Sequence, residues 1–132
     1  TGPDEMSMYV GQNYVQPTAH LARYSLRLDG FASVSAPFEE GEMTTKPILV
    51  TGNQLILNCS TSAAGSILVE VQTPDRESIP GFTLMESVVL VGDSIDRVVG
   101  WVTKPDLDAL AGQAVRFRFV MKDADLYALR FR

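Results

Sequence analysis

The sequence contains few of the residues on which most enzyme and metal sites depend. Its 132 residues include one cysteine, Cys59, and one histidine, His20. A single cysteine excludes an internal disulfide and a cysteine-rich metal site. A serine or cysteine nucleophile would have to use His20 as its base, but this histidine lies in a polar stretch beside Pro17, and no Gly-x-Ser-x-Gly motif occurs. We therefore expect no nucleophilic catalysis.

Basic charge and long apolar runs are also scarce. Eleven Lys and Arg residues stand against sixteen Asp and Glu residues, which gives a net charge of −5. This balance argues against a nucleic-acid partner, because such partners need a basic surface. No apolar run approaches the roughly 18 residues that a membrane helix requires, so we expect no membrane partner. No signal peptide is visible and the first residue is Thr1, so we expect a processed or excised piece.

The chain is rich in short runs in which apolar and polar residues alternate. The clearest run is Val115–Met121, whose apolar side chains alternate with Arg116 and Arg118. After a break at Asp123–Asp125, the alternation continues through Tyr127, Leu129 and Phe131. A period of two is typical of a strand with one buried face. The pattern predicts an antiparallel hairpin with its turn at Asp123–Asp125, crossing the middle of the fold.

About eight or nine such strands, separated by turn signals, predict an all-β protein. Long connections such as 74–86 favour a jelly-roll-like antiparallel β-sandwich over a meander. One short helical turn is expected at 105–112, where a proline begins and a glycine ends the segment. The run 6–10 also alternates, but a polar stretch at 11–20 follows it. We therefore predict a strand and linker over residues 1–22 and a β-sandwich over residues 23–132.

Carboxylates are plentiful, yet most lie in turns, where aspartate caps its own backbone. A glycosidase would need two of them facing each other roughly 5–10 Å apart. The acids considered for such a pair are Asp29, Glu42, Glu70, Asp93, Asp96, Asp123 and Asp125. We expect no catalytic pair among them. Calcium binds six to eight oxygen atoms from loops of this kind, so Asp93 with Asp96 and Asp123 with Asp125 are candidate ligands of a structural calcium ion.

Two aromatic side chains are candidates for sugar contact. An indole on an open sheet face can stack against a sugar ring, which makes Trp101 a candidate platform, with Tyr127 as a second one. The favoured role of Trp101 is nevertheless that of a core residue, because Val99 lies on the same strand face. Arg116, Arg118 and Arg130 could form a basic stripe, or could pair with acids on neighbouring strands such as Glu70.

Several segments in their order and spacing resemble a known module. They are ARYSLRLDGFASV, LILNCSTSAAGSILVEV, PGF, GDSIDRVVGW and LAGQAVRFRFVMKDADLYALRF. Together they resemble the C-terminal β-sandwich of bacterial putative glycosyl hydrolases that carry an N-terminal five-bladed β-propeller, similar to family 32 and family 43 glycosidases. The resemblance covers Asp4 to Phe131, and GPDEMSMY resembles the last strand of the propeller.

The resemblance implies a propeller domain as partner and a secreted or periplasmic parent protein. The family's catalytic carboxylates belong to the propeller, so no catalytic residue is carried over to this chain. We expect a non-catalytic accessory domain that packs on the propeller and stabilises it. The alternative is an autonomous carbohydrate-binding module. Burial of Trp101 would favour the first function, and exposure of Trp101 in a groove would favour the second.

Overall fold

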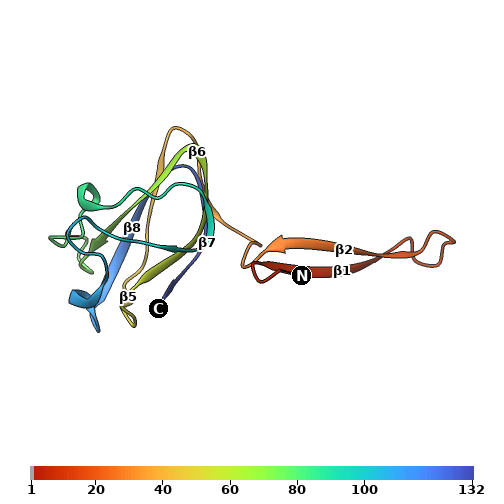
Figure 1. Ribbon diagram of the computed structural model, residues 1–132, viewed down its shortest axis with the longest axis horizontal. Helices are drawn as coiled ribbons and strands as arrows, with labels where there is room; N and C mark the ends of the chain where they lie inside the picture. Colours follow the sequence, from red (N-terminus) through yellow and green to blue (C-terminus); the bar gives the residue numbers. More distant parts are fainter. Residues whose placement is uncertain (1) are drawn as a thin grey trace. The chain divides into compact units, whose positions relative to one another are not determined.

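The computed structural model describes residues 2–132, and these residues form β-strands and two single turns of 3-10 helix (Figure 1). The chain divides into two compact units, residues 1–32 and 33–132. Each unit has its own strand pairing.

The first unit is a two-stranded antiparallel ribbon. Strand β1 (Glu5–Gln12) pairs with strand β2 (His20–Arg27) along its whole length. The polar stretch between them is a loop closed by hydrogen bonds, from the Gln16 amide to the Asn13 carbonyl and from the Ala19 amide to the Gln16 carbonyl.

The domain boundary expected after residue 22 is therefore wrong, because it falls inside β2. Ala22 pairs with Val10 and Tyr24 pairs with Met8, so the strand expected to begin the sandwich is the partner of β1. The second unit begins at Ser33. The polar composition of the loop concealed the hairpin, since a linker and a long hairpin loop use the same residue types.

The second unit is an antiparallel β-sandwich, which confirms the predicted fold class. Its elements are β3 (Val34–Ala36), β4 (Gly41–Thr44), β5 (Ile48–Leu49), β6 (Leu55–Gln72), η1 (Leu84–Glu86), β7 (Asp93–Val98), η2 (Asp108–Leu110) and β8 (Ala114–Phe131). The expected helical turn is η2, and Gly112 follows it with a φ of 76°.

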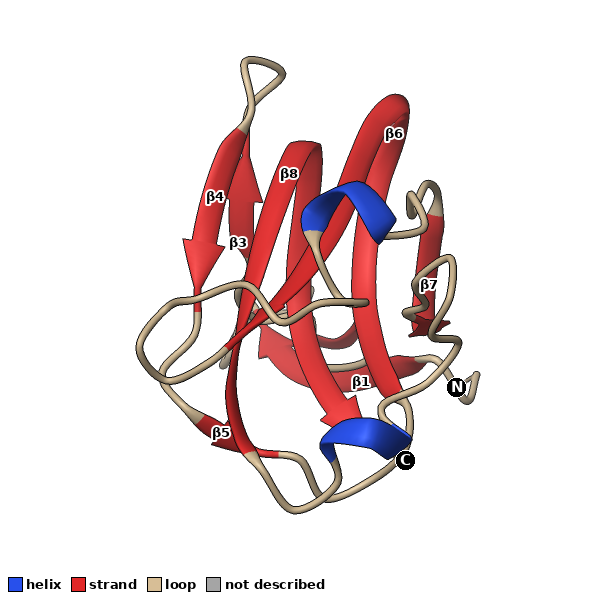
Figure 2. Ribbon diagram, turned by 90° about the vertical axis from the view of Figure 1, so that its left-hand side faces the viewer, coloured by secondary structure: helices blue, strands red, loops and turns tan. Residues whose placement is uncertain are grey.

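Strands β6 and β8 form the spine of the sandwich. They pair from Leu55–Phe131 at one end to Gln72–Arg116 at the other. Two straight strands of this length would extend for about 60 Å. Instead both strands arch over at one end (Figure 2), and the rings of Phe117 and Phe131 lie 5.9 Å apart, centroid to centroid. The doubled ribbon thus supplies both layers of the sandwich.

The prediction of a hairpin at the end of the chain is wrong, because the second half of β8 arches over together with β6. Residues 115–131 form one bent strand, and both of its halves pair with β6 rather than with each other. The bend lies where the register shifts between Thr61 and Ser66, opposite Asp123, whose φ is 42°. Such an irregularity increases the local bend without ending the pairing.

The remaining strands extend the two layers. Strands β3 and β7 flank one layer, in the order β3–β8–β6–β7, while β4 and β5 pair with the other half of β8. The core lies between the layers. Its largest fully buried side chains include Phe82, Phe117, Phe119, Leu55, Leu57, Ile67, Leu107 and Met121.

In the layer that contains β4 and β5, the edge of β6 that faces away from β8 is covered by the parts of segment 74–104 that flank β7. The amide of Val71 donates to the Phe82 carbonyl, and Ile67 and Leu90 exchange two backbone hydrogen bonds. Between these contacts, the Val69 amide donates to Ser87 Oγ at 2.9 Å. Side chains therefore complete a ladder that the backbone of this segment leaves incomplete.

Candidate functional site

Trp101 is part of the core. Its side chain is 2% exposed, and its Nε1–H donates to the Val69 carbonyl at 2.8 Å. The Phe82 ring meets the indole edge to face, with centroids 5.0 Å apart. A buried indole cannot stack on a sugar, so Trp101 is excluded as a sugar platform. The core role that its strand position allowed is the one observed.

Tyr127 lies at a second irregularity of β8. Asn58 pairs with Ala128 and Cys59 pairs with Leu126, so Tyr127 is the extra residue between the two pairs. The ring is partly exposed. The sequence alternation placed Tyr127 on the core face, but Ala124 and Leu126 are the buried residues there. Sugar contact at Tyr127 remains a prediction.

The first candidate calcium pair lies on strand β7. Asp93 and Asp96 are both exposed. Asp96 accepts a hydrogen bond from Ser94 Oγ at 3.1 Å, and its amide donates to the same oxygen. This is a local turn contact of the kind that aspartate commonly makes.

The second candidate pair lies at the bend of β8. Asp123 is exposed, and its amide donates to the Pro37 carbonyl at 2.9 Å. Asp125 accepts a hydrogen bond from Ser33 Oγ at 2.8 Å. Within residues 2–132, no group of three or more His, Cys, Asp or Glu side chains is arranged to hold a metal. Calcium binding at either pair remains a prediction, and a rise in melting temperature with added calcium would reveal it.

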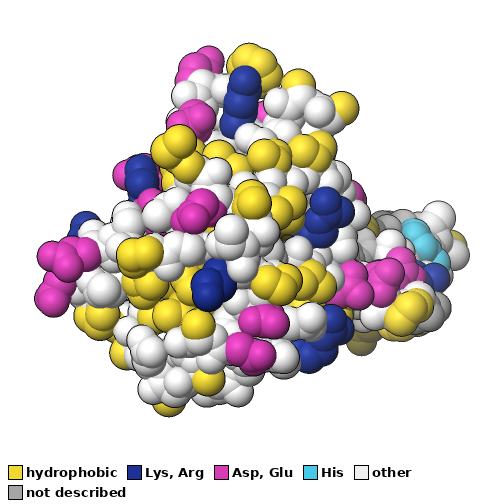
Figure 3. Space-filling view, turned by 60° about the vertical axis from the view of Figure 1, so that its left-hand side comes forward, with side chains coloured by type: hydrophobic (Ala, Val, Ile, Leu, Met, Phe, Trp, Pro, Cys, Tyr) yellow, Lys and Arg dark blue, Asp and Glu magenta, His cyan; other side chains and the backbone are white. Residues whose placement is uncertain are grey.

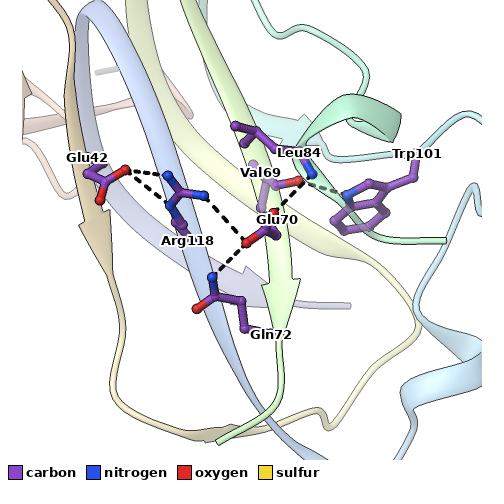
Figure 4. A network of polar contacts seen from close by, with 7 residues as sticks. All are labelled: Glu42, Val69, Glu70, Gln72, Leu84, Trp101 and Arg118. Atoms are coloured by element: carbon purple, nitrogen blue, oxygen red, sulfur yellow. Dashed lines mark hydrogen bonds and ion pairs between the residues drawn. The ribbon is translucent and has the colours of Figure 1, made fainter. Parts of the chain in front are cut away.

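Arg118 is the centre of a polar network on the outer face of β8 (Figure 4). Its guanidinium donates to Glu42 Oε2 at 2.6 and 3.1 Å and lies 3.6 Å from Glu70 Oε1. The hydrogen bonds with Glu42 are the main cause that raises the pKa of Arg118 above its ordinary value. Of the two roles considered for this arginine, pairing with acids on neighbouring strands is confirmed.

Glu70 is the buried member of this network, with 5% of its surface exposed. Its Oε1 accepts from Gln72 Nε2 at 2.6 Å, and its Oε2 accepts from the Leu84 amide at 3.2 Å (Figure 4). Both oxygens thus have donors, as a buried carboxylate requires. The network joins β4, β8 and β6 to η1.

Arg116 and Arg130 do not form a continuous basic stripe with Arg118. Arg116 donates to the carbonyls of Pro74 and Thr45, at 2.9 and 3.0 Å. Arg130 is exposed at the far end of β8. Figure 3 shows basic and acidic side chains interspersed among apolar ones on the face that it presents.

The network has the wrong arrangement for glycoside hydrolysis. A catalytic pair must flank the glycosidic bond of a bound sugar, and in inverting enzymes it must also leave room for a water molecule. Here the guanidinium of Arg118 contacts both Glu42 and Glu70. His20 does not belong to this network. It is exposed, and its Nδ1 lies 2.8 Å from the Thr18 carbonyl oxygen. The geometry therefore supports a structural role for these groups.

The ribbon brings together two alternating runs that the sequence analysis assigned to separate parts of the chain. One face displays apolar side chains from Met6 to Val10 and from Ala22 to Leu26, and Met8 and Tyr24 on it are each 49% exposed. The sequence signal was present, because residues 20–27 alternate in the same way as residues 5–12. A hairpin pairing of the two runs would have brought their apolar faces together.

No helix described in residues 2–132 is long and apolar enough to cross a membrane. Comparisons with protein-family models, curated proteins and solved structures find no match for this chain.

Proposed function

We propose that this chain is a non-catalytic accessory β-sandwich of a glycosidase-type protein, which packs on a catalytic five-bladed propeller and stabilises it. The propeller, and a secreted or periplasmic parent, come from the resemblance described above. The observation that carries the accessory role is the burial of Trp101, because this side chain was the best candidate for a sugar platform.

The acids of the sandwich support the same function. Glu70 is buried with donors on both oxygens, and Glu42 is held by Arg118. Asp96 and Asp125 each accept a hydrogen bond from a serine hydroxyl, Ser94 and Ser33 respectively. Each group thus contributes to the framework.

Two assays on the full chain test this function. Aryl glycosides of several sugars, at pH 5 and pH 7, should show no turnover, and electrophoresis in gels containing neutral or acidic polysaccharides should show no retardation. Turnover that disappears when one carboxylate is replaced would contradict the proposal. Retardation that Tyr127→Ala abolishes would instead support the carbohydrate-binding alternative.

A further inference from the structure

The ribbon has two chemically different faces. Directly opposed residues at even positions of β1 form three apolar pairs and one polar pair, namely Met6–Leu26, Met8–Tyr24, Val10–Ala22 and Gln12–His20. Side chains of opposed residues lie on the same face of a sheet, so this face is apolar from Met6 to Val10 and polar at its loop end, where Gln12 Nε2 donates to the Tyr24 hydroxyl.

The opposite face carries the exposed Tyr9 and Leu21, but its other side chains are mainly polar and pair with one another. Arg23 donates to Glu5 Oε1 at 2.7 Å and to Ser7 Oγ at 3.0 Å across the two strands. An isolated two-stranded ribbon is only marginally stable in water. The apolar face is therefore a surface that another β-structure can cover.

The two edges of the ribbon also differ. The amide of Leu28 donates to the carbonyl of Asp4, directly opposite, which extends the ladder by one pair. Hydrogen-bonded pairs alternate with non-hydrogen-bonded pairs in an antiparallel ladder. The backbone groups of the even residues of β1 therefore bond to β2. Those of the odd residues, including Tyr9 and Gly11, point away from β2, toward the free edge.

Charge distinguishes the edge of β1 from that of β2. From Met6 to Gln12, β1 carries no charged residue, whereas β2 carries Arg23 and Arg27 at positions whose backbone groups point outward. Charged side chains on an edge discourage the addition of another strand. Apart from Glu5 at its start, the β1 edge lacks this protection, so it is the edge at which a strand can be added.

The size of the ribbon decides between two kinds of partner. Eight residue pairs give a face roughly 27 Å long and 10 Å wide. Two copies stacked face to face would cover roughly 550 Å² of flat area, and even doubling this for surface roughness leaves less than the ~1,200 Å² of a stable interface. A sheet that continues beyond the ribbon can cover more.

We propose that the β1 edge accepts a strand from the β-sheet of another domain, whose apolar layer covers the face formed by Met6, Met8, Val10, Ala22, Tyr24 and Leu26. The ribbon, rather than the polar network of the sandwich, is then the docking element. The identity of that domain as a propeller rests on the proposed function. Strand addition at the β1 edge does not.

Backbone amide NMR of the full chain tests this proposal with a defined probe. The probe is a capped peptide in which valine and threonine alternate between terminal lysines. Added in increasing amounts, it should shift the amide signals of Tyr9 and Gly11 in a saturable manner and leave the amides of β2 and β7 unchanged. The same peptide N-methylated at every residue should cause no shift, because neither of its edges then has an N–H to donate to β1.

Proline variants provide a matched pair. Tyr9→Pro removes an outward N–H from the β1 edge and should abolish the shift at Gly11, while Ser25→Pro removes an outward N–H from the β2 edge and should leave it intact. Proline is tolerated at such edge positions. A cross-strand contact between Met8 and Tyr24 in each variant shows that the ribbon persists.

Three outcomes would overturn the proposal. They are the absence of saturable shifts, shifts centred on β2 or the sandwich, and dimerisation of the chain through β1 without peptide, which would make a second copy the occupant. Glycoside turnover would overturn the proposed function but would leave strand addition at β1 standing, so the two failures are distinguishable.

Discussion

Individual polar side chains complete the backbone hydrogen bonding of the sandwich. The Trp101 indole supplies the donor for the Val69 carbonyl at a point where the covering segment 74–104 provides no amide. Trp101→Phe should therefore lower the free energy of unfolding by roughly 1–3 kcal/mol, the usual cost of an unsatisfied buried acceptor. Urea denaturation measures this loss.

The neighbouring Val102→Ala is the control for Trp101→Phe, since Val102 is 75% exposed. It should change stability by less than about 0.5 kcal/mol. Equal stability of Trp101→Phe and the parent chain would show that the indole hydrogen bond is unimportant.

The Arg118 network predicts different costs for two arginines on one strand. Arg118→Ala removes the cation from buried Glu70 and should cost about 2 kcal/mol, because hydrogen bonds to charged groups contribute about 1.5–3 kcal/mol. Arg130→Ala, at an exposed position of β8, should cost less than about 0.5 kcal/mol. Similar urea midpoints for the two variants would contradict the bridging role.

The turn of η1 predicts a specific titration. The Thr83 hydroxyl donates to Glu86 Oε2 at 2.8 Å, and this contact is the main cause that lowers the pKa of Glu86 below 4.5. A pKa lowered by folding stabilises the folded state above the unfolded pKa, and this contribution is lost as the pH falls through the folded value. Thr83→Val should raise the pKa of Glu86, as measured by NMR titration. An unchanged pKa would show that the hydroxyl is not the donor.

At the scale of elements, the bend of β6 over β8 depends on one glycine. A β-carbon at Gly65 would lie 2.6 Å from the carbonyl oxygens of both Lys122 and Asp123. Gly65→Ala should therefore destabilise the sandwich by roughly 1–3 kcal/mol, in the range typical of overpacking.

Gly41→Ala is the matched change for Gly65→Ala, because a β-carbon there meets only Ala36 at an ordinary distance of 3.6 Å. It should have little effect on the thermal midpoint. If Gly65→Ala were equally well tolerated, the two strands would not cross as closely as described.

The same bend marks the limit of what the sequence could predict. Alternation correctly placed Phe117 and Phe119 in the core, because a period of two depends only on the local strand. It could not show whether a break at Asp123 ends a strand or bends it, since both use a residue with positive φ. The answer depends on the partner, and only the continuous pairing with β6 makes residues 114–131 one strand.

For the candidate sites too, the sequence predicted some contacts and left others open. The sequence predicted the pairing of Arg118 with Glu70 because both occupy polar positions of adjacent strands. It left Trp101 open between core and surface, because the burial of one strand face depends on segment 74–104 covering that edge. The pairing of β1 with β2 was missed because the loop between them has the composition of a linker.

At the scale of the whole molecule, the two units have different roles. All members of the hydrophobic core lie between Ala36 and Phe131. The ribbon carries its apolar residues on an exposed face. The central claim is that residues 33–132 form a self-sufficient framework and that the ribbon is an appended docking element.

Urea unfolding of a shortened chain of residues 33–132, followed by Trp101 fluorescence, tests this claim most directly. Trp101 is the only tryptophan and reports on the core of the sandwich. The account predicts a single cooperative transition that begins from the same native fluorescence as the full chain. Solvent-exposed tryptophan fluorescence without a transition would contradict it, because the sandwich would then need the ribbon in order to fold.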